Sequence, residues 1–267
     1  MTREKEVVDD LARRLVAARA GGRKLLIPFL TAGHPDLGSS ARAVAALGGA
    51  GADAIELGVP FSDPLADGPV IAAASERALA GGTTLGCVLG LAAERPPGGP
   101  PLVLFTYLNP FHAYGYARAA FDLARAGFAA ALVADLPFDE GAEVRAALET
   151  EGLPLVALAA PTTPAPRLRA LARSARGFVY LVARTGVTGA GSGADRRLFE
   201  QVRTLREETE LPIVIGFGIA DHEAARLAAG AADGIVVGSA FVQRLERDGV
   251  EPAVEWIAGL RRAVDAA

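Results

Sequence analysis

The chain is poor in the residues that several classes of protein depend on. Its 267 residues contain one cysteine, Cys87, so no disulfide can form within the chain. A lone cysteine suits a reducing compartment, and we expect a cytoplasmic protein. The net charge is −4, and the arginines are scattered among acidic residues instead of forming a basic stripe. Because contacts with nucleic-acid phosphates need such a stripe, the sequence predicts no nucleic-acid partner.

Long apolar runs are also missing. No segment approaches the roughly 20 consecutive apolar residues that a membrane-spanning helix needs, so we expect no membrane association. The charged start of the chain, residues 1–6, has no apolar core behind it and does not resemble a signal peptide. What the sequence does contain is 51% apolar and 22% charged residues without low-complexity repeats. This composition predicts a large buried core and argues against disorder.

Short apolar runs alternate with helical patterns eight times along the chain. Each run is apolar throughout, as expected for a parallel strand that is covered on both faces. Eight such units predict a single-domain α/β protein, a (β/α)8 or TIM barrel over residues 1–267. An open doubly wound sheet would have fewer strands and a Gly-x-Gly-x-x-Gly motif after the first, which is missing here. The expected strands are residues 25–31, 53–59, 102–108, 130–135, 154–159, 177–183, 212–218 and 234–239.

The segments between these runs predict crossover helices, with Asp, Ser or Pro near the start and Gly near the end. Residues 3–20 form an amphipathic pattern and predict an extra N-terminal helix that closes the bottom of the barrel. The proline- and glycine-rich residues 96–101 predict a turn into the third strand. The clearest helical patterns cover residues 40–47, 117–126, 140–151 and 221–229.

The second expected strand carries a carboxylate among apolar residues. Because side chains alternate between the two faces of a strand, Glu56 shares its face with Ala54 and Gly58, whose small size leaves room for a ligand. Burial of an ionised carboxylate is costly and raises its pKa toward neutrality, where proton transfer is efficient. A glutamate that forms a salt bridge across the barrel would give the same pattern. Asp63 and Asp67 in the following loop favour catalysis.

Active sites of such barrels lie at the carboxyl ends of the strands. There the seventh and eighth strands end in glycines, and the chain after Gly238 can begin a short helix whose positive end favours an anion. The pair of glycines predicts a phosphate site, although glycines that only permit tight turns are the alternative. Residues 183–193 contain four glycines and predict a mobile lid, with an ordinary surface loop as the alternative.

The few lysines and histidines narrow the chemistry. Lys5 and Lys24 both lie at the predicted bottom of the barrel, which argues against a Schiff base. His34, His112 and His222 all fall in predicted loops at the active face, so a zinc-dependent aldol site is an alternative. None of them shows the paired spacing of a metal-binding helix. The chemistry that remains for a phosphate ester is acid and base catalysis by carboxylates, without a metal or a covalent intermediate.

Several motifs, in this order along the chain, resemble the tryptophan synthase alpha subunit family. They are residues 28–33 (PFLTAG), 56–69 (ELGVPFSDPLADGP), 134–137 (ADLP), 160–163 (APTT), 185–189 (TGVTG) and 238–239 (GS). The resemblance spans about residues 25–245, and the motif at 56–69 is its most specific part. It implies a lyase that cleaves indole-3-glycerol phosphate to indole and glyceraldehyde 3-phosphate. It also implies an α2β2 heterotetramer that passes indole to a beta subunit for tryptophan synthesis, with pyridoxal phosphate only in that partner and no cofactor in this chain.

The resemblance also implies roles for individual residues. Glu56 matches the general acid and base, and Asp67 matches the carboxylate that stabilises positive charge at the indole nitrogen. Thr188 matches the lid threonine, and Tyr180 belongs to the wall of the site. The indole slot corresponds to Phe29, Ile71, Phe105 and Tyr107; the phosphate site to Gly189, Phe217, Gly218, Gly238 and Ser239; and the beta-subunit contacts to Pro60, Asp63 and Asn109.

Three other functions share some of these features. A stand-alone lyase that releases free indole would use the same catalytic residues and would be independent of a beta subunit. A non-catalytic barrel could serve as a regulatory or interaction partner, although the intact Glu56 and Asp67 argue against it. A sugar-phosphate isomerase or epimerase on the same fold would bind pentose phosphates and would not bind indole compounds.

Overall fold

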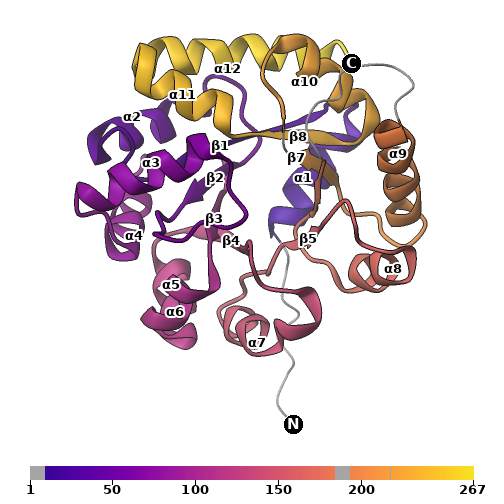
Figure 1. Cartoon of the computed structure of the whole chain (residues 1–267), viewed down its shortest axis with the longest axis horizontal. Coiled ribbons are helices and arrows are strands. Elements are labelled where there is room, and N and C mark those ends of the chain that lie inside the picture. Colours follow the sequence, from indigo (N-terminus) through magenta and orange to yellow (C-terminus); the bar gives the residue numbers. More distant parts are fainter. Residues whose placement is uncertain (1–9, 184–192, 217) are drawn as a thin grey trace.

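Eight parallel strands form the centre of the molecule (Figure 1). The computed structural model describes residues 10–183, 193–216 and 218–267. The strands are hydrogen-bonded in the order β4-β3-β2-β1-β8-β7-β6-β5, and backbone hydrogen bonds between Ala131 and residues 154 and 156 close the ring. The predicted TIM barrel is therefore confirmed. The strands are β1 (Leu25–Thr31), β2 (Ile55–Gly58), β3 (Leu102–Thr106), β4 (Phe128–Val133), β5 (Ala157–Ala159), β6 (Val179–Val182), β7 (Ile213–Gly216) and β8 (Gly234–Val237).

Helices surround the strands (Figure 1). Several begin at capping residues that the sequence makes visible: the Asp36 and Asp221 side chains accept backbone N–H bonds at the starts of α2 and α10. The helices are α1 (Asp10–Ala20), α2 (Leu37–Leu47), α3 (Pro69–Ala80), α4 (Leu85–Ala93), α5 (Leu108–Tyr114), α6 (Tyr116–Arg125), the short 3-10 helix η1 (Phe138–Glu140), α7 (Ala142–Thr150), α8 (Ala165–Ser174), α9 (Gly193–Arg206), α10 (His222–Ala231), α11 (Ser239–Asp248) and α12 (Val250–Asp265). Within the described residues, no helix is long and apolar enough to cross a membrane.

The buried residues separate into layers according to the alternation of the strands. Ile55 and Leu57 of β2 face outward and pack in the layer between strands and helices, whereas Ala54 lies in the interior of the barrel. Leu11 and Leu15 of α1 belong to the same interior cluster. The N-terminal helix therefore closes the barrel, as predicted, although the residues expected before Asp10 lie outside the described part of the chain.

Some strands are shorter than the apolar runs predict. β5 covers three residues instead of six, in part because Pro154 has no N–H group to donate to its neighbour. β3 ends at Thr106, since α5 begins at Leu108. The proline-rich residues 96–101 lie between α4 and β3, as the predicted turn requires.

Charged residues at the amino ends of the strands are paired. Asp53 accepts hydrogen bonds from Arg23 Nε at 2.8 Å, Arg261 Nη1 at 3.0 Å and the Leu26 N–H at 2.8 Å. Lys24 Nζ donates to the Ala232 carbonyl at 2.7 Å. Lys24 thus lies at the bottom of the barrel, as predicted, and the carboxylate network there holds the strand ends together.

Candidate active site

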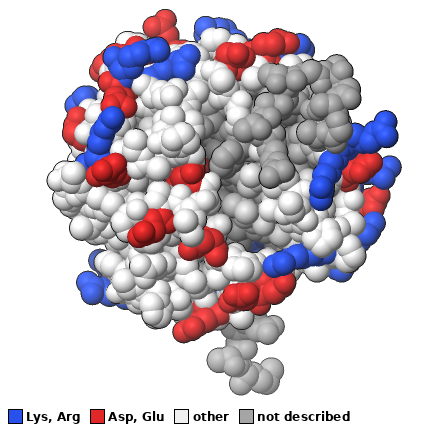
Figure 2. Space-filling model, in the orientation of Figure 1, with Lys and Arg blue, Asp and Glu red and all other residues white. Residues whose placement is uncertain are grey.

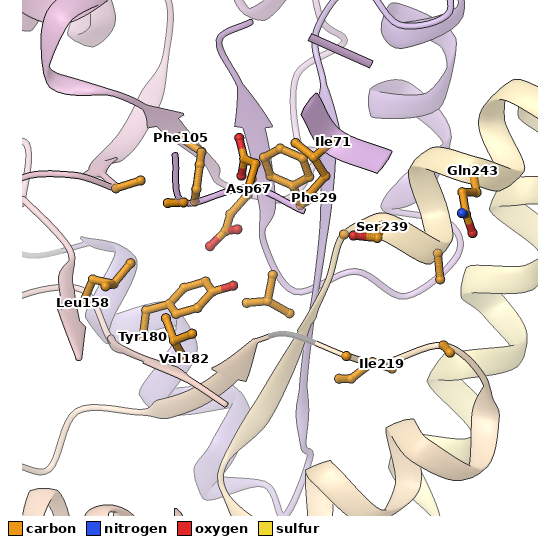
Figure 3. Close-up of a pocket in the computed structure, with 18 of the residues that line it drawn as sticks. Phe29, Asp67, Ile71, Phe105, Leu158, Tyr180, Val182, Ile219, Ser239 and Gln243 are labelled. Carbon is orange, nitrogen blue, oxygen red and sulfur yellow. The ribbon is translucent and has the colours of Figure 1, made fainter. Parts of the chain in front are cut away.

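A cavity of about 320 Å³ opens at the carboxyl ends of the strands (Figure 3). Strands β1, β2, β3, β5, β6 and β8 contribute to its walls, together with the loop after β2 and the segments that follow β7 and β8. This is the end of the barrel where the sequence predicted the site. The lining residues are Phe29, Glu56, Ala66, Asp67, Ile71, Phe105, Ala134, Leu158, Tyr180, Val182, Gly218, Ile219, Ala220, Val236, Gly238, Ser239, Ala240, Gln243 and Arg244.

Glu56 is fully buried on β2 and lines this cavity. Within the described part of the chain, neither of its carboxylate oxygens has a hydrogen-bond partner. Burial raises the pKa of Glu56 from its ordinary 4.5 to about 8. A glutamate that served as a structural salt bridge would have a cation beside it, and no such ion pair occurs among the described residues. The carboxyl oxygens are therefore available to a ligand in the cavity.

The space beside Glu56 is smaller than the sequence predicts. A Cβ atom at Gly58 would lie 2.7 Å from the Phe29 ring, so this ring occupies the space that the glycine leaves. Phe29 in turn lines the cavity and contacts Phe105 edge-on, with ring centroids 5.2 Å apart. Together with Ile71, these rings give the cavity an apolar wall, on which a flat aromatic ligand can pack.

Asp67 lies in the loop after β2 and also lines the cavity. Burial raises its pKa from 3.8 to about 6, although a hydrogen bond with the Tyr107 hydroxyl acts in the opposite direction. That hydroxyl also accepts the Ala66 N–H at 2.9 Å. The loop is therefore held by Tyr107. This side chain is buried but is not among the described residues that line the cavity, and its ring centroid lies 5.0 Å from that of Phe61.

Tyr180 on β6 forms part of the opposite wall (Figure 3). Burial raises its pKa well above the ordinary value, and the charges of Glu56 and Asp67 contribute further. The three groups therefore converge on one space. A Cβ atom at Gly216 on the neighbouring strand would overlap the Tyr180 hydroxyl. The glycine is required here because the tyrosine ring passes over its backbone.

The other end of the cavity has the features of an anion site. Gly218, with a φ angle of +80°, follows β7, and Gly238 is the residue before α11. Since the first N–H groups of a helix have no partner within it, the start of α11 at Ser239 presents donors to this end of the cavity. The other predicted phosphate residues, Gly189 and Phe217, lie outside the described residues, as do Thr188 and most of the predicted lid.

The residues expected to meet a partner lie apart from the cavity. Pro60 and Asn109 line a shallow surface hollow beside α5. Asp63 is in the exposed loop after β2 and accepts the Ser62 hydroxyl at 2.5 Å. Leu65, in the same loop, is 94% exposed. The loop thus links the cavity wall, through Asp67, with an exposed surface that contains an apolar side chain.

None of the three histidines lines the cavity. His34 is buried in the loop after β1, and His112 Nδ1 lies 3.1 Å from the Tyr116 hydroxyl. His222 begins α10 and lies beside Trp256. The described residues contain no group of three or more His, Cys, Asp or Glu side chains that could hold a metal ion. The zinc alternative therefore has no site in the part of the chain that the structure describes.

Sequence reasoning missed several lining residues. Leu158 and Val182 lie on β5 and β6, and the alternation of those strands could have revealed them as inward-facing. Gln243 and Arg244 belong to the second turn of α11. Their position depends on how the helix is rotated against the barrel, and the sequence carries no signal for it.

Comparisons with known proteins agree with this geometry. The family model described as "Tryptophan synthase alpha chain" matches residues 15–262. The tryptophan synthase alpha chain of Laribacter hongkongensis is 48% identical over 264 residues, which cover 97% of this chain and all of the relative. That of Synechococcus elongatus is 47% identical, with 93% of this chain and 94% of the relative covered.

Solved structures show the same likeness. Tryptophan synthase subunit alpha from Legionella pneumophila superposes with a TM-score of 0.87 at 31% identity, over 96% of this chain and 98% of that one. A chain of tryptophan synthase from M. tuberculosis, in an aminoacrylate-bound form, gives a TM-score of 0.86 at 35% identity, over 95% and 98%. The chain described here therefore belongs to the tryptophan synthase alpha chain family.

Proposed function

We propose that this enzyme subunit is a lyase that cleaves indole-3-glycerol phosphate to indole and glyceraldehyde 3-phosphate. The observation that carries the proposal is the buried Glu56 carboxyl, without a hydrogen-bond partner in the described structure, in a cavity that also contains Asp67. The cavity has an apolar wall suited to an indole ring and an end suited to a phosphate. Membership of the family supports the same reaction.

The substrate pose follows from the walls of the cavity. The indole ring lies against Phe29 and Phe105, and its N–H group donates to Asp67. The phosphate lies at the start of α11, near Gly238. This pose places the bond between the indole ring and the glycerol chain in the middle of the cavity, near Glu56.

The reaction needs one proton delivered and one removed. Protonated Glu56 donates its proton to C3 of the indole ring, and the ring nitrogen becomes positively charged. The Asp67 carboxylate stabilises this charge in a site of low dielectric constant. The Glu56 carboxylate then takes the proton of the side-chain hydroxyl next to the ring. The carbon–carbon bond breaks, its electrons restore the aromatic ring, and the hydroxyl carbon becomes the aldehyde of glyceraldehyde 3-phosphate.

The two pKa values suit these two roles. With a pKa of about 8, Glu56 is protonated in the resting enzyme near neutral pH and can act first as an acid. With a pKa of about 6, Asp67 is ionised under the same conditions and can stabilise a positive charge. Two carboxyl groups in one cavity are thus assigned opposite protonation states by their surroundings.

We further propose that the chain works with a tryptophan synthase beta subunit in an α2β2 heterotetramer in the cytoplasm. The exposed loop with Asp63 and the surface hollow with Pro60 and Asn109 would form part of the contact. The alpha chain itself would need no cofactor, and pyridoxal phosphate would belong to the beta subunit. We also infer that residues 1–267 form one domain, because α1 and α12 both pack against β1.

The test is the rate of indole release from indole-3-glycerol phosphate by the purified chain, with and without a beta subunit. Glu56→Gln serves as the inactive reference, and Glu149→Gln, which changes an exposed glutamate on α7, is the matched control. We expect slow release by the chain alone, a large increase with the beta subunit, and loss in Glu56→Gln only.

Other results would point to other functions. Fast release that does not depend on the beta subunit would favour the stand-alone lyase. Absence of release in both conditions would contradict the proposal. Binding of pentose phosphates without binding of indole would then favour an isomerase or epimerase, and binding of neither would favour a non-catalytic barrel.

A further inference from the structure

Arg244 is a charged group in the cavity to which the reaction assigns no role. Among the described residues that line the cavity, the ionisable carboxylates are Glu56 and Asp67, and Arg244 is the sole cation. Glu56 comes from β2 and Asp67 from the loop that follows it, whereas Arg244 comes from α11. Negative and positive groups thus approach the cavity from different elements. A ligand with an anionic end would be oriented by this separation.

The guanidinium of Arg244 is held in a defined place. Its Cζ atom lies 4.0 Å from the centroid of the Trp256 ring on α12. Its Nη1 donates to the Ala240 carbonyl at 3.2 Å. Because Ala240 is the second residue of α11, this bond brings the guanidinium back beside the first turn of the helix, where Ser239 and Ala240 line the cavity. The guanidinium therefore lies close to the start of α11, where the phosphate is expected.

Arg244 forms no salt bridge with the described residues, although the hydrogen bond from Arg247 and, more weakly, the charge of Arg244 lower the pKa of Asp248, one turn further along α11. Within the described part of the chain, no carboxylate oxygen lies within 4.0 Å of its guanidinium nitrogens. Arg247, one turn further along the same helix, shows the contrast: its Nε lies 2.7 Å from Asp248 Oδ1, and its side chain is exposed. On the face shown in Figure 2, basic groups outside the grey atoms lie toward the edge of the molecule. Arg244 is therefore the cation, among the described lining residues, that is available to an anionic ligand.

On the basis of the proposed function, we infer that Arg244 is an additional binding residue for the phosphate of the substrate and that Trp256 positions it. A guanidinium presents paired N–H donors whose spacing matches two phosphate oxygens. The N–H groups at the start of α11 and the Arg244 guanidinium would then contact the same anion from two sides. Stacking on Trp256 limits the freedom of the long side chain, so less entropy is lost when the phosphate binds.

The inference is tested first by binding of glycerol 3-phosphate, measured by titration calorimetry at low ionic strength. Arg244→Gln should raise the Kd about tenfold, the order expected for a charge-assisted contact with phosphate. Arg247→Gln, which removes a positive charge from the same helix outside the cavity, should leave the Kd unchanged. Binding of indole should be equal in all three proteins. Thermal unfolding of each variant shows whether the fold is intact.

Two further variants separate charge from packing and test the role of Trp256. Arg244→Lys keeps the charge and should recover a large part of the affinity for glycerol 3-phosphate. Trp256→Leu should raise the KM for indole-3-glycerol phosphate about threefold with kcat unchanged. The variant removes the ring on which Arg244 stacks and leaves Glu56 and Asp67 as they are. A fall in kcat at constant KM in Trp256→Leu would contradict the positioning role.

The outcome is distinct from that of the proposed function. If Arg244→Gln binds glycerol 3-phosphate as tightly as the unchanged protein, the inference is wrong even when indole release is normal. If Arg244→Gln weakens this binding while no indole is released by the unchanged protein, the phosphate role of Arg244 is supported and the proposed reaction fails. Equal losses in Arg244→Gln and Arg247→Gln would show a general effect of charge and would overturn the specific contact.

Discussion

The two ends of the barrel differ in the bonding partners of their carboxylates. At the bottom, Asp53 is bonded to two arginines and a backbone N–H group. Asp233, also at that end, pairs with Arg206 and accepts the Ile213 N–H at 2.8 Å. At the top, Glu56 is completely buried and has no hydrogen-bond partner in the described structure.

The paired carboxylates at the bottom contribute to stability, whereas the unpaired carboxyl at the top serves the proposed reaction. Burying an unpaired carboxyl is unfavourable, and the barrel accepts that cost at the top because the group must react with a ligand. The paired acids at the bottom join the strands and the last helix, since Arg261 belongs to α12. Substitutions at the top should therefore change the reaction, and substitutions at the bottom should change the free energy of unfolding.

The largest expected effect is that of Glu56→Gln on catalysis. An amide of the same shape cannot donate and recover the proton, so kcat for indole release should fall about 10³-fold, within the range of general acid and base catalysis. Steady-state kinetics with the beta subunit present would measure it. Retention of more than a tenth of the activity would show that Glu56 is not the proton donor and would remove the contrast between the two ends.

Asp53→Asn tests the bottom of the barrel. It weakens the bond at 3.0 Å from Arg261, whose side chain is almost completely buried. Because Arg261 keeps its second carboxylate, Asp265, the free energy of unfolding should fall by about 2 kcal/mol. Urea unfolding measures this change, and kcat of the folded enzyme should stay the same. Asp10→Asn, which removes an exposed acid from a pair with Arg14, is the control and should cost less than about 1 kcal/mol.

The pH dependence of stability should differ in sign from that of a paired acid. The pKa of Glu56 is about 8 in the folded protein and 4.5 in its ordinary state. Between these values the folded protein keeps a proton that the unfolded chain has released. Glu56 should therefore lower the free energy of unfolding by about 1.4 kcal/mol per pH unit as the pH rises from about 5 to 8. Below pH 4.5 Glu56 is protonated in both states and does not lower the free energy of unfolding. Above pH 8 it is ionised in both states, and the fall in the free energy of unfolding is complete.

Glu56→Gln provides the reference for this measurement, because glutamine does not titrate. The stability of the variant relative to the unchanged protein should increase from pH 5 to pH 8. Asp67 adds a loss of the same sign between pH 3.8 and about 6 in both proteins. A difference between the two proteins that stays constant with pH would contradict the raised pKa of Glu56.

The smallest effect is expected for Tyr107→Phe. The variant removes the hydroxyl that accepts the Ala66 N–H and bonds Asp67, at a cost of about 1 kcal/mol in stability. Because the hydrogen bond lowers the pKa of Asp67, its loss should raise that pKa and move the acidic limb of the pH profile for kcat/KM to higher pH. Tyr116→Phe, which removes a hydroxyl near His112 outside the cavity, should leave the profile unchanged. An unchanged profile in both would show that Tyr107 does not hold the Asp67 loop.

The sequence predicted the barrel and Glu56 because both follow from local alternation. A strand with both faces covered is apolar throughout, and a carboxylate within it is visible without knowledge of the fold. Tyr107 lies beyond the reach of local alternation. The resemblance implies a place in the indole slot, but β3 ends at Thr106 and α5 begins at Leu108, and Tyr107 is not among the described residues that line the cavity.

Arg244 shows a second limit. Its neighbour Trp256 is twelve residues away and belongs to the next helix, so no local pattern joins them. Only the packing of α11 and α12 against the barrel decides which helical side chains reach the cavity. The same holds for Gly58, where sequence predicted free space and the structure shows the ring of Phe29, which comes from a different strand.

The close approach of Tyr180 and Gly216 limits how this wall of the cavity can change through evolution or design. Any side chain at 216 would meet the tyrosine hydroxyl, so the first substitution there would fail while the tyrosine remains. A smaller residue at 180 must come first. The two positions, on neighbouring strands, must therefore change together. A library that varies one position at a time would contain few active members, whereas a library that varies both at once could reshape this wall.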